Sequence, residues 1–202
     1  TLEAFQRLRE HGFESNTMQN MKYENNSFSP PPFLRSTSTF VRSPSIKSTG
    51  SDRTRSLSQL SRPLPAGLKT HVFLAHTWMV DELGRNNHNR VSKINEELIQ
   101  RGFITWFDAT ELSGDIRQKM ADGLYNTCCV ILFLTKGYEK KINSNDQKDN
   151  CFYEFNVIAG DNLVNRRIPV AMEKAMIDPR NWQRARLQAE LGTQLIIDFS
   201  ED

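Results

Sequence analysis

The sequence predicts a doubly wound α/β domain whose parallel sheet has about five strands. Short apolar runs alternate along the chain with segments whose apolar residues recur at the spacing of a helix. The short runs are mostly continuous, without the polar alternation of a half-exposed strand. Such runs are typical of parallel strands that helices cover on both faces.

The predicted strands are the apolar runs at 71–75, 103–107, 128–134, 166–172 and 195–199. The run at 128–134 is apolar at every position, so both of its faces must be covered. Helices are predicted at 91–102, 115–126 and 151–160. Gly102 is expected to end the first helix, and Asp115 is expected to cap the start of the second.

A change of composition near Lys69 separates this domain, expected at 70–202, from a tail. Residues 27–65 are rich in Ser, Thr, Pro and Arg and show no strand or helix period. Such a segment buries too little apolar surface to offset its ordering entropy, so we expect residues 1–69 to be mostly disordered. A short helix is expected at 1–12. Because the first residue is Thr1, we expect a fragment of a longer protein.

One motif of the tail predicts a modification. Residues 53–58 have the Arg-x-Arg-x-x-Ser spacing that basic-directed kinases favour, with Ser58 as the acceptor. Phosphorylation there would add a charge of roughly −1.5 to −2. A chance match in an unmodified linker is the alternative, because short motifs of this kind recur in Ser/Arg-rich sequence.

Composition disfavours several classes of function. The 26 basic and 24 acidic residues give a net charge of +2, so no nucleic-acid partner is expected. Cys128, Cys129 and Cys151 are odd in number, two are adjacent, and no CxxC pair is present, so neither a disulfide framework nor a metal site is expected. Free thiols indicate a reducing, cytoplasmic location. No apolar stretch approaches the roughly 20 residues of a membrane span.

The loops at the carboxyl ends of the predicted strands are where an open parallel sheet binds ligands. The first of them carries His76, Thr77 and Trp78, and neither GxGxxG nor GxxxxGK[ST] is present. A glycine-rich phosphate cradle is therefore unsupported. The second loop, from Phe107 to Gly114, is rich in acidic residues.

Several segments together resemble a TIR (Toll/interleukin-1 receptor) domain. HVFLAHTW resembles the first strand and first box of that family. WFDATELSGDIRQKMADGLYNTCCVILFLTKGY is similar to its second strand, BB loop, second helix and third strand. In DNCFYEFNVIA, Cys151 and Glu154 resemble the helix that carries the catalytic glutamate of NAD-cleaving members. RRIPVAME, followed by Trp182, resembles the fourth strand and its exit loop, so the likeness covers residues 70–199.

The resemblance implies a flavodoxin-like fold, with a five-stranded parallel sheet and helices on both faces. It also implies a cytoplasmic signal-transduction domain of innate immunity that associates with itself through TIR–TIR contacts. The assembly residues would be those of the BB loop, which overhangs the ligand pocket in this family: Ala109, Thr110, Glu111, Leu112, Ser113 and Gly114.

The likeness to NAD-cleaving members implies that Glu154 is the catalytic residue of an NAD hydrolase. Nicotinamide leaves the ribose as a neutral group, so one carboxylate beside an oxocarbenium-like ribose is chemically sufficient. The products would be nicotinamide and ADP-ribose or a cyclic form, with NAD as the substrate and no cofactor. An ordinary exposed glutamate on an amphipathic helix is the alternative interpretation.

The substrate-binding candidates lie around these loops: His76, Thr77, Trp78, Phe107, Asp108 and Cys151. Trp78 and Phe107 have the rings to stack on nicotinamide or adenine, and the edge of the core is their alternative role. Thr77 and Trp78 stand where family members often carry a basic residue, so Arg85 or Arg90 is the substitute candidate for a phosphate contact. Solvated loop charge is the alternative for both arginines. Asn150 stands where related domains often carry tryptophan, a departure from the enzymatic pattern.

Two other functions compete with NAD cleavage. A scaffold that acts only through assembly of TIR domains is the main alternative, because many members work in this way. A flavin-binding or phospho-receiver domain is disfavoured. A receiver needs acidic residues after the first strand and an aspartate after the third, where this chain has His-Thr-Trp and Thr-Lys-Gly.

Overall fold

The computed structural model describes residues 62–107, 115–160 and 166–201. Within these ranges, five parallel strands form one sheet in the order β2-β1-β3-β4-β5. The strands are β1 (Thr70–Ala75), β2 (Thr105–Trp106), β3 (Thr127–Leu134), β4 (Arg167–Ala171) and β5 (Ile197–Asp198). The predicted α/β fold class with a five-stranded parallel sheet is confirmed. The predicted helix at 1–12, Ser58, Asp108 and the BB-loop residues lie outside the described residues.

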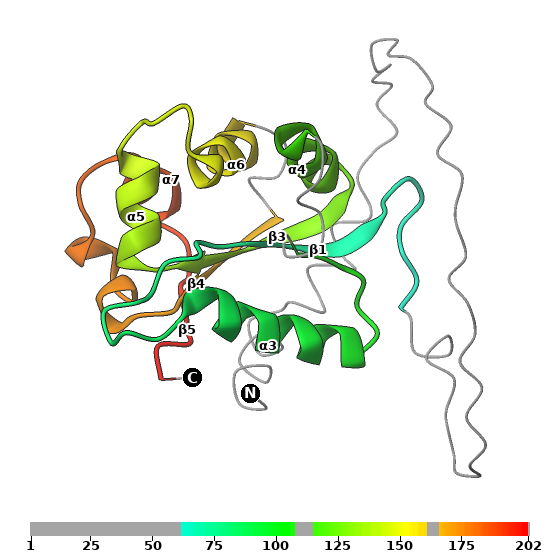
Figure 1. Ribbon diagram of the computed structural model, residues 1–202, viewed down its shortest axis with the longest axis horizontal. Helices are drawn as coiled ribbons and strands as arrows, with labels where there is room; N and C mark the ends of the chain where they lie inside the picture. The colour runs from blue at the N-terminus through cyan, green and yellow to red at the C-terminus, as the bar shows by residue number, and fades with distance from the viewer. Residues whose placement is uncertain (1–61, 108–114, 161–165, 202) are drawn as a thin grey trace.

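The helices cover the two faces of the sheet unequally. They are α3 (Asn87–Gln100), α4 (Ile116–Tyr125), α5 (Lys136–Asn143), α6 (Asn150–Gly160) and α7 (Arg186–Leu191), with short 3-10 turns η4 (Lys174–Met176) and η5 (Pro179–Asn181). Figure 1 shows α3 alone below the sheet and α4, α5 and α6 above it. The core agrees, because α3 packs in one apolar cluster and α4 to α7 pack in the other.

Strand alternation divides the core into these two clusters. Val72 and Leu74 of β1 point toward α3, whereas Phe73 and Ala75 point toward the opposite layer. Every residue of β3 is buried, as its continuous apolar sequence predicts. Because the central strand is covered on both faces, polar chemistry is restricted to the ends of the strands.

Local signals explain most helix boundaries. Gly102 has a φ of 82°, the left-handed conformation expected just after a helix. The Asp115 carboxylate accepts a hydrogen bond from the Gln118 amide at 3.1 Å and caps α4 as predicted. Helix α3 begins earlier than predicted, because the Asn86 side chain caps it by accepting from the Asn89 amide at 2.9 Å. Helix α5 was not predicted, since its sequence is largely polar.

The end of the predicted tail packs against the sheet. The Arg62 amide donates to the Gly102 carbonyl at 3.0 Å, and the Arg62 guanidinium lies 4.4 Å from the centre of the Phe103 ring. The Lys69 amide donates to the Asn126 carbonyl at 2.8 Å. Residues 62–69 therefore belong to the folded unit. In the described ranges, no helix has the length and apolar character needed to cross a membrane.

Candidate functional site

A cavity of about 560 Å³ lies beyond the carboxyl ends of β1 and β2. The loop after β1 forms one wall with residues 76–79, and Trp106 lines the cavity at the end of β2. The first turns of α4, the end of α5 and the start of α6 complete the lining. This is the edge of an open parallel sheet at which ligands bind. The cavity volume lies within the range of about 300–1,000 Å³ that is usual for small-molecule sites.

Glu154 lies in the lining of this cavity, on α6. Only 5% of the residue is exposed, so the interpretation as an ordinary exposed glutamate is wrong. Phe152, Phe155 and Ile158 of the same helix are buried in the core and fix its rotation. Cys151, one turn before Glu154, also lines the cavity, and its Sγ lies 3.6 Å from the His76 carbonyl oxygen.

Tyr138 of α5 lies near this carboxylate. Burial is the main cause that raises the pKa of its hydroxyl far above the usual value, and the negative charge of Glu154 adds to it. Among the described residues the hydroxyl has no hydrogen-bond partner. Tyr138 therefore stays protonated.

Asp149 holds the start of α6. Its carboxylate accepts from the Phe152 amide at 3.1 Å and from Lys141 Nζ at 2.6 Å. Burial would raise the pKa of Asp149, but the hydrogen bonds from Lys141 and Phe152 outweigh it and hold the pKa below its usual value. An ionised Asp149 thus ties α6 to α5 beside the cavity.

The loop after β1 carries a group of stacked rings. His76 is buried, with Nδ1 3.0 Å from the Leu74 carbonyl oxygen and Nε2 2.8 Å from His88 Nδ1. The Trp78 ring stacks on His88 with a centroid separation of 3.9 Å, and Trp78 is 51% exposed where it lines the cavity. Phe107 stacks on His76 and His88 at 5.3 and 5.0 Å.

The predicted substrate residues separate into two groups. His76, Thr77, Trp78 and Cys151 line the cavity together with Glu154. Phe107 is not among the lining residues and packs against the core cluster on the α3 side. For Phe107, the structure favours the core-edge alternative.

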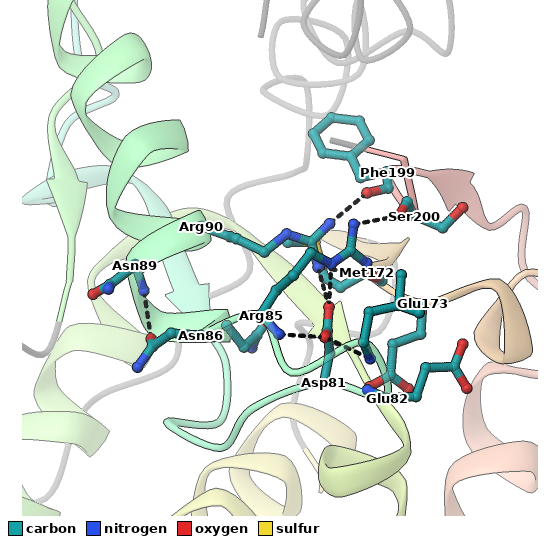
Figure 2. Close-up of polar contacts among 12 residues, drawn as sticks. Asp81, Glu82, Arg85, Asn86, Asn89, Arg90, Met172, Glu173, Phe199 and Ser200 are labelled. Atoms are coloured by element: carbon teal, nitrogen blue, oxygen red, sulfur yellow. Dashed lines mark hydrogen bonds and ion pairs between the residues drawn. The ribbon is translucent and has the colours of Figure 1, made fainter.

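Arg85 and Arg90 both bind Asp81, and we call these three residues the clamp. Arg85 Nε and Arg90 Nη1 lie 2.6 and 3.1 Å from the same Asp81 carboxylate oxygen, whose side chain is completely buried. Both guanidinium groups also donate to carbonyls after β4 and β5, those of Met172, Phe199 and Ser200 (Figure 2). Neither arginine lines the cavity that contains Glu154, so the predicted phosphate role at that cavity is wrong. Arg90 is also part of α3 rather than of a loop.

A second buried carboxylate extends this clamp toward α5. Glu173 accepts hydrogen bonds from the backbone amides of Glu82 and Lys136, at 3.0 and 2.7 Å. Burial raises the pKa of Glu173 against the lowering effect of these two amides. The clamp borders another cavity, of about 360 Å³, which is lined by Arg85, Arg90, Lys93 and Met172 among others.

The TIR domain family model matches residues 72–202 of the chain. The chain belongs to the TIR domain family. Searches of curated proteins and of solved structures found no match. TIR domains are signal-transduction domains that act by homotypic contacts, and this is the class of function that family membership supports. The predicted resemblance is confirmed at the level of the family, whereas membership of the NAD-cleaving branch stays a prediction.

Several lining residues of this TIR domain were not predicted from the sequence. They are Met79, Trp106, Ile116, Lys119, Met120, Lys141, Lys148, Asp149 and Asn150. Their only sequence signal is their position, since many flank the predicted strands and the helix that carries Glu154. His88 was also missed, because a single histidine in a run of asparagines has no apolar period. Cys128 and Cys129 are buried in the core.

Proposed function

We propose that this TIR domain hydrolyses NAD to nicotinamide and ADP-ribose, or to a cyclic form, with Glu154 as the catalytic residue. The observation that carries the proposal is a buried glutamate in the lining of a cavity at the ligand-binding edge of the sheet. Perturbed or buried ionisable groups in a cavity of this kind mark candidate functional sites.

The chemistry requires one negative charge beside the ribose. As the bond between C1 of the ribose and the nicotinamide nitrogen breaks, both bonding electrons go to the nitrogen, and the pyridinium becomes neutral nicotinamide. The ribose becomes an oxocarbenium-like cation that the Glu154 carboxylate stabilises. A water oxygen then bonds to C1 and releases a proton, which completes hydrolysis. Attack by a nitrogen of the adenine ring instead of water gives the cyclic product.

The remaining walls of the cavity have chemistry that suits the rest of NAD. Lys119, Lys141 and Lys148 line it from α4, α5 and the turn before α6. Their ammonium groups are suitable partners for the two negative charges of the diphosphate. Trp78 provides a flat surface for nicotinamide or adenine. We therefore assign the phosphate contact to these three lysines, which form the helical wall of the cavity, and not to Arg85 or Arg90.

Self-association is the second part of the proposal. Family membership supports homotypic contacts, and the BB-loop residues, including Leu112, stay the predicted contact surface. The three cysteines are free thiols, which supports a reducing, cytoplasmic location.

The test is nicotinamide release from NAD by the full chain at high protein concentration, with chromatography of the products. We expect Glu154→Gln to reduce release by at least about a hundredfold, as loss of a main transition-state contact does, while circular dichroism and the unfolding midpoint stay unchanged. Lys140→Gln is the matched control, because Lys140 is exposed on α5 and lies outside the cavity lining. Release that Glu154→Gln does not reduce would contradict the proposal.

A scaffold that acts only by assembly is the second candidate, and it is favoured by exposed apolar residues after β1. Val80 and Leu83 are 59% and 68% exposed. If the chain acts only as a scaffold, the wild-type chain releases no nicotinamide and Glu154→Gln leaves signalling intact. Leu112→Arg then breaks association. Measuring assembly by light scattering alongside nicotinamide release separates the two candidates.

A further inference from the structure

We propose that His88 is a positioning residue that holds Trp78 as the wall of the cavity on which a flat ring of the substrate stacks. His88 belongs to α3, on the face of the sheet opposite α6, yet its ring reaches the first loop of the cavity. The inference rests on the proposed function, because the flat ring is one of the two rings of NAD.

The orientation of His88 follows from a chain of two hydrogen bonds. The Leu74 carbonyl oxygen only accepts, so the contact of 3.0 Å places a proton on Nδ1 of His76. With His76 in its neutral form, Nε2 is an acceptor, and His88 Nδ1 donates across the contact of 2.8 Å. His76 is buried, so this chain fixes the plane of the His88 ring relative to the backbone of β1.

The His88 ring in turn supports the indole of Trp78. Their centroids are 3.9 Å apart and their planes differ by 21°. Phe107 adds a third nearly parallel ring, at 5.0 Å and 15° from His88. The backbone of His88 is fixed as well, because it is the second residue of α3, which Val91 anchors in the core.

Support from His88 matters because Trp78 is half exposed and lines the cavity. A half-exposed side chain loses rotamer freedom when a ligand orders it, and that loss weakens binding. A ring that is already stacked has lost this freedom before the ligand arrives. Stacked aromatic pairs contribute free energies that correspond to about a two- to tenfold change in an equilibrium constant.

A pair of substitutions separates the ring of His88 from its hydrogen bond. His88→Asn keeps a side-chain N–H near the position of Nδ1 and removes the ring, whereas His88→Phe keeps a ring and removes the donor. The parent is the full chain with Glu154→Gln, which we expect to bind NAD without turnover, and calorimetry measures the Kd of NAD. We expect His88→Asn to raise Kd about fivefold and His88→Phe to restore it to within about twofold of the parent.

Asn89→Ala is the control, because Asn89 is the exposed neighbour on α3 and lies outside this cavity. It should leave Kd unchanged. Weakening by His88→Phe without weakening by His88→Asn would assign His88 to the hydrogen-bond chain alone and overturn the inference. Equal weakening by both variants would show that a ring at position 88 is not sufficient to hold Trp78, and it would overturn the inference as well. An unchanged Kd in His88→Asn would overturn it too.

Two further measurements distinguish positioning from a general structural role. Acrylamide quenching of Trp78, isolated by comparison with a Trp78→Phe chain, should increase in His88→Asn. In chains that retain Glu154, His88→Asn should raise KM and leave kcat unchanged, since it removes a contact that substrate and transition state share. A fall in kcat at unchanged KM would contradict the inference.

The outcomes also separate this inference from the proposed function. If the wild-type chain releases no nicotinamide but His88→Asn still weakens NAD binding, hydrolysis fails and the positioning role stands. If NAD is hydrolysed with the same KM in His88→Asn, hydrolysis stands and the positioning role fails. If the parent chain does not bind NAD at all, both fail.

Discussion

The two halves of the segment after β1 use their polar side chains differently. Residues 76–79 line the cavity beside Glu154, and Trp78 and Met79 stay substantially exposed there. Asp81, Arg85 and Arg90 instead bind one another and the ends of β4 and β5 (Figure 2). The charged half of the segment therefore stabilises the fold, while the half with aromatic rings faces the site.

The largest expected effect is on the charged half. Asp81→Ala leaves two partly buried guanidinium groups without their shared carboxylate, so we expect the free energy of unfolding to fall by about 3 kcal/mol or more. Urea unfolding of the full chain measures it. Asp178→Ala is the control, because the ion pair of Asp178 with Arg180 is on the surface and should hardly change the midpoint. A small change in Asp81→Ala would mean that the clamp does not hold the segment.

The cavity beside residues 76–79 is tested through Gly123 of α4. A Cβ on Gly123 would lie 2.7 Å from Nε1 of Trp106, whose ring lines the cavity and stacks on Phe73 at 4.1 Å. Gly123→Ala must displace this ring, so we expect a loss of about 1–3 kcal/mol in unfolding free energy together with weaker NAD binding. Gly160→Ala is the matched control, since no atom lies within 4 Å of its Cβ position. Equal behaviour of the two variants would show that the ring moves at no cost.

Acid affects the two buried carboxylates of this region, Asp81 and Glu173, in opposite directions. Burial would raise the pKa of Asp81, but hydrogen bonds from Arg85 and Leu83 lower it below its usual value near 3.8. The stability from Asp81 is therefore complete above about pH 5 and is lost as pH falls through the lowered pKa. Glu173 has the opposite sign: its raised pKa gives full stability below its usual value of 4.5, and that stability falls as pH rises through the raised pKa.

An Asp81→Asn chain isolates the aspartate in this pH dependence. Unfolding free energy measured between pH 3 and pH 7 should fall less on acidification in Asp81→Asn than in the wild type. The slopes should converge above about pH 5, where the wild-type Asp81 is ionised in both the folded and unfolded states. Parallel curves across the whole range would show that Asp81 does not contribute to the pH dependence of the unfolding free energy.

The smallest expected effect concerns the helical wall of the cavity. Lys148→Gln should weaken binding of ADP-ribose about threefold, and added salt should reduce the difference, because the contact is between exposed charges. Lys140→Gln, which removes the same charge outside the cavity lining, should leave binding unchanged. A loss of the same size in both variants would indicate general attraction of an anion and not a contact in the cavity.

Particular residues show how much could be predicted from sequence. The sheet was predictable because strands such as Thr127–Leu134 have apolar residues on both faces. A continuous apolar run of this kind is typical of a parallel strand that is covered on both sides. Helix α5 was missed because only Tyr138 and Ile142 carry its apolar face, among several lysines. Glu154 was predicted as a catalytic residue through the family resemblance. The helical pattern of its segment alone could not show whether its side chain is buried or exposed.

The site residues that were missed or misplaced depend on contacts between distant parts of the chain. The Asp81–Arg85 spacing is a local signal of an ion pair, but the carbonyls after β4 and β5 that engage the arginines come more than 80 residues later. His88 binds His76 only because α3 begins near the end of β1 in space. Periodicity reports which faces are buried and does not report which polar groups meet.

Hydrogen–deuterium exchange of the Glu154→Gln chain, with and without NAD, locates the binding site for NAD. We expect slower exchange with NAD in peptides that cover residues 76–79 and 148–154, which line the cavity around position 154. Peptides from 85–94, which border the smaller cavity beside the clamp, should exchange at the same rate with and without NAD. Protection confined to 85–94, or no protection at saturating NAD, would contradict this expectation.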